Sequence, residues 1–331
     1  IDQKERRFCP SQPTLSRCFV CSRDNILLSY SSKICKLMKL ASLTALVAAI
    51  EEGSLRGAAR RLNISQPALT KMLRALEVEL SATLLTRTSK GVKPTEQGKA
   101  LHARALTVTR ELKLATDEIS QLSGNMTGEL TIGAVPLAVM LIIPETLRTF
   151  CRAFPNIQLK VTEELYIAQL HRLRKGEVDV AVGGIPDDLP KGEFTIEPLM
   201  TTTMVVVARK GHPLAQAKSL HELAGASWVY TGANSESGYV KALFEANGMP
   251  APKVGAIVNS TLTLLSIVAS GDVLGLMPLQ IAVHPTTAQF ISVVPIAEKG
   301  LDLTVGAIIR SDSAVSPAIR HLITHMHRAA Q

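Results

Sequence analysis

The sequence lacks the features of a membrane-spanning or secreted protein. None of its apolar runs approaches the roughly 20 residues that a transmembrane helix needs. No apolar stretch followed by a small-residue cleavage site is seen near the first residue, so no signal peptide is predicted. Hydrophobic residues nevertheless make up 46% of the 331 residues, which is ample for packed cores. We therefore expect a cytoplasmic protein of two or three domains with no membrane partner.

The sequence also lacks recognisable catalytic motifs. It contains no P-loop, GxSxG or HExxH pattern, and no nucleophile–base set is visible. His321, His325 and His327 fall on the last predicted helix, opposite its apolar residues, and are expected to form a solvated face. The pair at 321 and 325 has a spacing that could hold an adventitious metal, but no carboxylate ligand is nearby. We predict a protein that is not an enzyme and has no cofactor or metal site.

Cysteine is scarce outside the first 37 residues. Cys9, Cys18, Cys21 and Cys35 lie there, and Cys151 is the remaining one. A Cys-x-x-Cys pair invites a zinc interpretation, yet the outer spacings match no regular paired knuckle. Residues 1–37 also lack hydrophobic periodicity, which begins at Met38. We interpret residues 1–37 as a non-native or disordered extension and exclude them from the fold.

The net charge of +8 is unevenly distributed. Lys and Arg exceed Asp and Glu by four in residues 1–37 and by five in residues 38–127, whereas residues 128–331 carry a net −1. This asymmetry indicates an N-terminal part that binds a polyanion, most simply nucleic acid. Charge alone leaves a merely solvated basic surface as an equal alternative.

Three short helices are predicted after Met38. Apolar residues recur at helical spacing from Leu40 until Glu51-Glu52-Gly53 ends the first helix. Ser54 is placed to cap the second helix, and Ser65 the third, which has Pro67 in its first turn. Two short helices joined by a tight turn, the second beginning with polar side chains, are typical of a helix-turn-helix.

A wing is predicted after the third helix. The segment LLTRTSKGVKPTEQG indicates a strand, a glycine turn and a second strand, with Arg87, Lys90 and Lys93 on the hairpin. Such cations can lie along a phosphate backbone or enter a minor groove.

Two motifs in this region resemble those of the LysR-type transcriptional regulators. AAxxLxxSQPAxxxxxxxLE runs from Ala58 to Glu77, and LLxRTxxGxxPTxxG runs from Leu84 to Gly98. The resemblance covers residues 38–331. The family usually has Ser-Arg where this chain has Thr70-Lys71, so a bidentate Arg–guanine contact cannot come from position 71. The resemblance and the local pattern together imply DNA contacts from Ser54, Arg56, Ser65, Gln66, Pro67, Thr70, Lys71, Arg74, Arg87, Lys90 and Lys93. For Ser65 and Thr70 a capping or plain surface role is the alternative.

Residues 95–122 form one uninterrupted helical pattern. Its apolar residues are spaced alternately four and three apart, which is typical of a coiled-coil seam, although a long helix packed on its own domain is the alternative. The resemblance agrees, because such regulators pair through this linker helix and so present two reading heads. A flexible hinge is expected at 123–128. The predicted seam comprises Leu101, Ala105, Val108, Leu112, Ala115, Ile119 and Leu122.

Strand-like and helical segments alternate beyond the hinge. The segments form two βαβαβ series, and two further strands, at 201–208 and 301–309, are expected to pass between them. This pattern implies two α/β lobes with ligand sites at the carboxyl ends of parallel strands. This arrangement resembles the two-lobed, periplasmic-binding-protein-like (type 2) effector domain of the family. We predict a winged helix-turn-helix at 38–95, a linker at 96–127 and an effector domain at 128–331, in which lobe I spans 128–205 and 302–331 and lobe II spans 206–301.

The effector site is predicted in the loops after these strands. A loop that opens into a helix offers unpaired N–H groups to a carboxylate or sulfonate. The first loop is apolar here, where many relatives have Ser or Thr, and Tyr166 falls where relatives have a small hydroxyl residue. Plain turn chemistry is the alternative for the glycines. The predicted lining is Val135, Pro136, Leu137, Tyr166, Gly183, Gly184, Thr231, Gly232, Asn259, Ser260, Thr261 and Pro278.

The expected function is therefore that of a LysR-type regulator that binds double-stranded DNA under control of a small organic anion. A solute-binding or transport module is the alternative, since it would share the two-lobed body, but the basic head and the missing signal peptide argue against it. The resemblance further implies association into a dimer or tetramer and RNA polymerase as a candidate partner.

Overall fold

A computed structural model of the chain describes residues 38–89, 91–164, 166–186, 189–190, 192–232, 238–311 and 315–331, without the side chains of 166 and 167. Residues 1–37, with their four cysteines, and Lys90 therefore lie outside the described residues. The chain divides into two compact units, Ile1–Thr109 and Arg110–Gln331. The division falls inside one long helix, so each unit contains part of it. None of the helices in the described ranges is long and apolar enough to cross a membrane.

The first unit is a three-helix cluster with a two-stranded hairpin. Its elements are α2 (Leu40–Glu51), α3 (Leu55–Arg61), α4 (Gln66–Glu79), β1 (Leu85–Thr88), β2 (Gly91–Pro94) and the start of α5 (Glu96–Leu122). Small side chains at Ala58 and Ala59 let α3 pack closely on α2 and α4, where they are buried with Leu46, Leu69 and Leu76. The antiparallel hairpin pairs Leu85 with Pro94 and Thr88 with Gly91. The predicted winged helix-turn-helix is confirmed.

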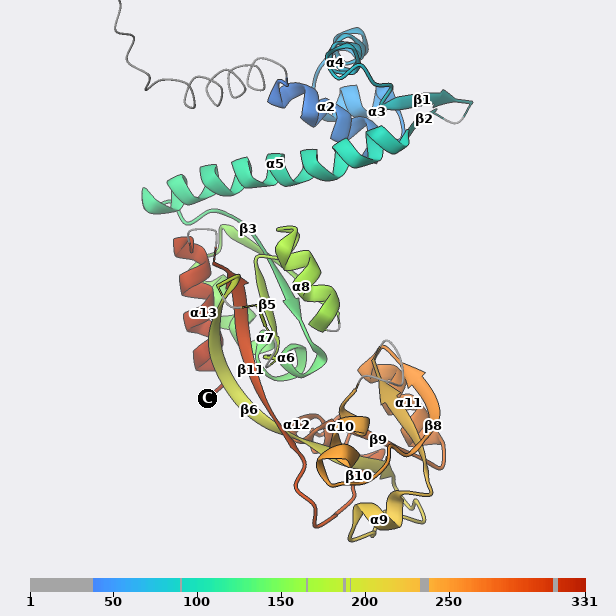
Figure 1. Ribbon diagram of the computed structural model, residues 1–331. Coiled ribbons are helices and arrows are strands. Elements are labelled where there is room, and N and C mark those ends of the chain that lie inside the picture. The colour runs from blue at the N-terminus through green and yellow to red at the C-terminus, as the bar shows by residue number, and fades with distance from the viewer. Residues whose placement is uncertain are drawn as a thin grey trace, which may run out of the picture. The chain divides into compact units, whose positions relative to one another are not determined.

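The second unit contains a nine-stranded mixed sheet covered by helices (Figure 1). Its first part comprises β3 (Gly128–Ala134), α6 (Pro136–Leu141), α7 (Ile143–Ala153), β4 (Ile157–Glu163), α8 (Tyr166–Arg174), β5 (Val180–Gly184) and β6 (Phe194–Arg209). It continues with α9 (Leu220–Leu223), β7 (Ser227–Thr231), α10 (Tyr239–Ala246), β8 (Lys253–Val258), α11 (Thr261–Ser270) and β9 (Val273–Pro278). It ends with α12 (Leu279–Ala282), β10 (Ile291–Val293), β11 (Leu301–Arg310) and α13 (Pro317–Ala329).

The strand order β4-β3-β5-β11-β6-β9-β7-β8 explains the two lobes. On one side β3 pairs in parallel with β4 and β5, and on the other β7 pairs in parallel with β8 and β9. The antiparallel pair β6 and β11 joins the two sets, as Figure 1 shows for these two long strands. Two parallel βαβ sets joined by crossing strands confirm the predicted two-lobed α/β domain.

Candidate DNA interface, linker helix and effector loops

Helix α4 is built with one buried and one exposed face. Ser65 caps its N-terminus, because the side-chain oxygen accepts a hydrogen bond from the Ala68 N–H at 3.3 Å. Leu69, Leu73 and Leu76 are buried in the core of the first unit. The other face lines a shallow surface groove of about 720 Å³, and its residues are Gln66, Pro67, Thr70, Lys71, Arg74, Ala75 and Val78. Five of the predicted DNA-contacting residues are thus brought together on one face.

The remaining predicted contacts lie on α3 and on the wing. Ser54 caps α3 by accepting from the Gly57 N–H at 3.2 Å, and Arg56 is exposed in the same helix. On the hairpin Arg87 and Lys93 are exposed. Both serines therefore have a capping role in the structure, and their contacts with DNA stay a prediction.

The predicted seam residues of α5 divide into two groups. Leu101 and Ala105 pack against Leu43 and Val47 of α2 within the first unit, where Ala105 is buried. From Val108 onward the predicted seam residues are exposed, including Leu112 at 46%, Ile119 at 65% and Leu122 at 71%. An apolar stripe left open along a helix is what pairing with a second copy would cover. The seam stays a prediction.

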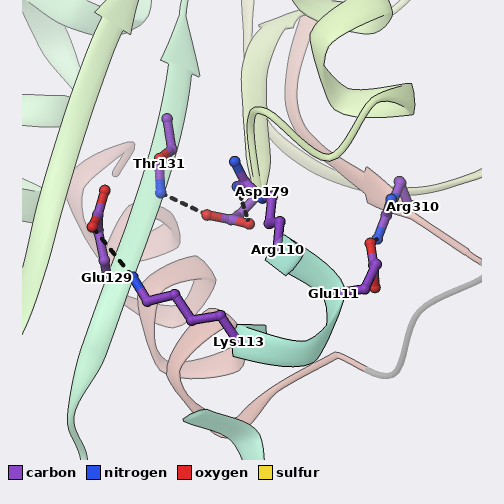
Figure 2. A network of polar contacts seen from close by, with 7 residues as sticks. All are labelled: Arg110, Glu111, Lys113, Glu129, Thr131, Asp179 and Arg310. Carbon is purple, nitrogen blue, oxygen red and sulfur yellow. Dashed lines mark hydrogen bonds and ion pairs between the residues drawn. The ribbon is translucent and has the colours of Figure 1, made fainter. Parts of the chain in front are cut away.

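The C-terminal half of α5 is fixed to lobe I by ion pairs (Figure 2). Arg110 donates to Oδ1 of Asp179 at 2.8 Å, and the Thr131 N–H donates to Oδ2 at 2.7 Å. The Asp179 side chain is only 5% exposed, so its charge is compensated almost entirely by these two donors. One carboxylate thus links α5 to strand β3 at the start of β5.

Further contacts secure the helix on either side of this pair. Glu111 accepts from Arg310 at 2.8 Å, while Lys113 and Glu129 form a more exposed pair at 3.4 Å. Near the helix end the buried Gln121 donates to the Thr127 carbonyl at 3.1 Å and accepts from the Ala318 N–H at 3.2 Å. Residues 110–122 therefore belong to lobe I structurally.

The chain makes a hydrogen-bonded turn after α5, within the segment 123–128 where a flexible hinge is expected. The N–H groups of Gly124 and Asn125 donate to carbonyls in the last turn of α5, and Gly124 has a φ of 91° that allows the chain to reverse. Together with the Gln121 contacts these bonds form a closed turn. Gly124 thus ends α5 as a helix C-cap, and flexibility of this segment stays a prediction.

The predicted effector loops of lobe I lie side by side. Ala134 and Val182 are register partners of the parallel strands β3 and β5, and the Val135 N–H donates to the Val182 carbonyl at 2.9 Å. Val135, Pro136 and Gly184 are half-buried at these strand ends, and Gly183 is buried. Leu137 is buried in the main hydrophobic core. Tyr166 begins α8, and its side chain lies outside the described residues.

The lobe II loops are brought together in the same way. Thr231 is the register partner of Val258, and the Gly232 N–H donates to the Val258 carbonyl at 3.0 Å, so the loops after β7 and β8 adjoin. Ser260 caps α11 by accepting from the Thr263 N–H at 3.5 Å. Beside it Asn259 is exposed and Thr261 half-buried, as is Pro278 at the end of β9. Each lobe thus groups its own predicted residues at the carboxyl ends of parallel strands.

One prediction on the last helix is wrong. His325 is not solvated, because it packs against Phe150 and Phe154 and lies 2.8 Å from the Thr149 hydroxyl. Burial first, and then Arg328 and His321, lower the pKa of His325 below its ordinary value. His321 is exposed beside Phe154, while His327 lies 3.7 Å from Glu197. No group of three metal-ligating side chains occurs among the described residues.

Sequence reasoning missed three polar side chains that organise these sites. Asp179 and Gln121 hold α5 to lobe I, and Glu77 accepts two backbone N–H groups at the base of the wing. Glu77 was visible as part of a motif, and Asp179 as the acid that precedes a buried strand. Their partners could not be read from the sequence, since Arg110 lies 69 residues from Asp179.

Two family descriptions match the chain. "LysR substrate binding domain" matches residues 123–331, and "Bacterial regulatory helix-turn-helix protein, lysR family" matches residues 40–99. The chain is 29% identical over 298 residues to the HTH-type transcriptional regulator GbpR of Azospirillum brasilense, covering 88% of this chain and 87% of that protein. It is 30% identical over 288 residues to the HTH-type transcriptional regulator TfdS of Cupriavidus pinatubonensis, covering 86% and 96%.

Solved structures show the same fold. CbnR, described as a LysR family transcriptional regulator, superposes with a TM-score of 0.64 at 21% identity, covering 89% of this chain and all of that one. Full-length CbnR complexed with its target DNA gives a TM-score of 0.65 at 21% identity, with 88% and 100% coverage. The two-unit architecture is therefore shared along almost the whole described chain.

Proposed function

Because the chain belongs to the LysR family of DNA-binding transcriptional regulators with an effector-binding domain, we propose specific roles for its residues. Gln66, Pro67 and Arg87 contact the bases of a target duplex, and the loops of the two lobes hold a small organic anion. The solute-binding alternative finds no support in any of the matches.

The exposed face of α4 is the observation that carries the DNA proposal. Gln66, Thr70 and Lys71 share one groove-lining surface, and the hairpin that bears Arg87 begins six residues after the helix ends. An α-helix fits the major groove, in which a Gln amide can form two hydrogen bonds with adenine. A cationic hairpin suits the narrower minor groove. On the α4 face Lys71 acts as a point charge in the major groove. Arg74, one turn further along the same face, reaches toward phosphate.

A salt titration of DNA binding tests the proposal. Binding of the full chain to duplexes is measured by gel shift at increasing salt, and log K is expected to fall with log[salt] with a slope that corresponds to about 6–10 phosphate contacts per dimer. Arg74→Gln should reduce the slope by about one contact per chain. Lys218→Gln, at an exposed cation of lobe II, is the matched control and should not change it. Absent or salt-independent binding would contradict the proposal.

The effector proposal rests on the grouping of loops at the carboxyl ends of the parallel strands β3, β5, β7, β8 and β9. Backbone N–H groups at such ends attract carboxylates and sulfonates. A thermal-shift screen of small aromatic and aliphatic carboxylates and sulfonates tests it, since a compound at 100 times its Kd stabilises the protein by about 2.7 kcal/mol. Thr231→Val should reduce the shift given by any compound that binds there. A screen without any shift would count against an organic anion.

We further propose that two chains pair along the exposed stripe of α5 between Val108 and Leu122. Pairing would place two reading heads on one two-fold-related DNA site. A tetramer and a contact with RNA polymerase are finer predictions that follow from family membership alone.

A further inference from the structure

A carboxylate of helix α4 accepts two backbone hydrogen bonds at the base of the wing. Oε1 of Glu77 accepts hydrogen bonds from the N–H groups of Leu84 at 2.8 Å and Leu85 at 3.2 Å. Glu77 lies in the last turns of α4, and Leu85 is the first residue of β1. Hydrogen bonds that a charged acceptor receives are shorter and stronger than neutral ones. The carboxylate therefore fixes the first strand of the wing directly to the helix that carries Gln66.

The other attachments of the wing come from different elements. The Thr95 hydroxyl donates to the Thr83 carbonyl at 2.7 Å, and the Val92 N–H donates to the Gly53 carbonyl at 2.9 Å. A Cβ on Gly91 would lie 2.1 Å from that same carbonyl oxygen, so the contact requires glycine there. These bonds tie the hairpin to α5 and to the turn before α3. Glu77 differs because its bonds set the position of the wing relative to α4.

The space between wing and helix is narrow and basic. Thr70, Arg74 and Glu77 of α4 face Leu85, Arg87 and Val92 of the wing across a groove of about 120 Å³. One DNA strand separates a major groove from the adjacent minor groove, so its backbone must pass between a helix in the first and a wing in the second. The distance between the wing and α4 therefore decides whether α4 can contact bases in the major groove while the wing contacts bases in the minor groove.

An acidic residue is unexpected on a surface that binds DNA. Acidic side chains repel phosphates, and an unengaged Glu beside a polyanion would weaken binding. Glu77 is half-buried, and its charge is engaged by two backbone N–H groups. Glu77 is therefore positioned to hold the wing to α4 and not to contact DNA itself.

We propose that Glu77 is a positioning residue for DNA recognition, which holds the wing at the distance from α4 that lets Arg87 and Gln66 contact adjacent grooves together. The inference rests on the proposed DNA-reading roles of these two residues. It predicts that loss of Glu77 impairs recognition by the wing selectively and leaves recognition by α4 intact.

The test uses the full chain and a duplex that the wild-type protein selects from a random-sequence pool. Bases protected by wing and helix are located by footprinting, and affinities are then measured by fluorescence anisotropy on single-base variants at each position. For Glu77→Ala we expect about tenfold weaker binding to the selected duplex. Base changes under the wing that weaken the wild type about tenfold should weaken this variant less than about threefold, because a loosely held wing does not discriminate. Discrimination under α4 should be unchanged.

Two further variants make the result specific. Glu77→Gln keeps a carbonyl acceptor for the two N–H groups and should recover most of the discrimination under the wing. Glu79→Ala removes the same charge from an exposed position two residues further along α4 and should bind like the wild type. Should Glu77→Ala not fold, as judged by thermal unfolding, Glu77→Asp takes its place, because its carboxylate is one methylene shorter and reaches less far toward the two N–H groups. A loss of discrimination confined to the wing bases in Glu77→Asp would support the inference, and wild-type discrimination there would overturn it.

The contrary outcomes are distinct. A wild-type protein that enriches no sequence would overturn the proposed function and the inference with it. Enrichment by the wild type, together with intact wing discrimination or a uniform loss at all positions in Glu77→Ala, would overturn the inference alone.

Discussion

Asp179→Ala should destabilise the second unit severely, although residue 179 lies outside both predicted binding sites. The substitution leaves the Thr131 N–H without its acceptor and Arg110, whose side chain is 28% exposed, without its partner. An unsatisfied buried N–H costs about 1–3 kcal/mol. Removing one partner of a buried ion pair costs about 3–5 kcal/mol in all, because the other charge stays uncompensated. We expect a loss of about 3–5 kcal/mol in the free energy of unfolding.

Calorimetry and urea unfolding of the full chain measure this loss. For a unit of this size the expected destabilisation lowers the Tm at which the second unit unfolds by about 6–20 °C. Glu129→Ala is the matched control, since it removes an acid that is paired with the same helix but is 41% exposed, and it should cost about 0–1 kcal/mol. Arg110→Ala combined with Asp179→Ala should be less destabilising than the sum of the two single changes. Equal effects of Asp179→Ala and Glu129→Ala would refute the reasoning that burial makes this pair decisive.

Three further predictions concern reading, pairing and pH. Gln66→Ala should reduce discrimination by about 1–3 kcal/mol at one base position and leave unfolding unchanged, and equal losses on all duplexes would show that Gln66 does not read bases. Leu112→Lys should yield monomers in sedimentation velocity, and a dimeric variant with full DNA affinity would contradict the seam. Because the pKa of His325 is lowered in the folded chain, its stabilising contribution is present above the ordinary value of about 6.5 and is lost as the pH falls through the folded pKa. Acidification from about pH 7.5 to 5.5 should therefore lower the Tm of the wild type more than that of His325→Gln, and parallel Tm curves would contradict this account.

Features that depend on neighbouring residues could be predicted from the sequence. Helix α11 begins and ends at local signals, because Ser260 caps its start and the glycine at 271 follows its last residue, just before β9. The exposed face of α4 also followed from local signals, namely the cap at Ser65 and the apolar spacing behind it. Caps and apolar spacing depend on residues only a few positions apart, so the folded protein keeps the local structure that they predict.

Features that depend on distant partners could not be predicted. The first half of β6, residues 194–200, was not predicted; Pro198 lies there beside the register shift between β6 and β11, a position where a strand tolerates proline. After β3 the chain forms two successive helices, α6 and α7, and Pro144 lies in the first turn of the second. The burial of His325 was not predicted, because the rings that cover it, those of Phe150 and Phe154, are far away in sequence.

The contacts of α5 place the proposed seam and lobe I in one structural body. Between 110 and 122 one side of the helix is held by Asp179 and by the buried Gln121, while Leu112 and Ile119 are exposed on the helix. Asp179 directly precedes β5 and accepts from Thr131 in the middle of β3, and both strands end in the loops predicted to hold the effector. If two chains pair along this stripe as proposed, the contacts of Asp179 and Gln121 hold lobe I to the paired helix, so that lobe I and the pairing surface form one body.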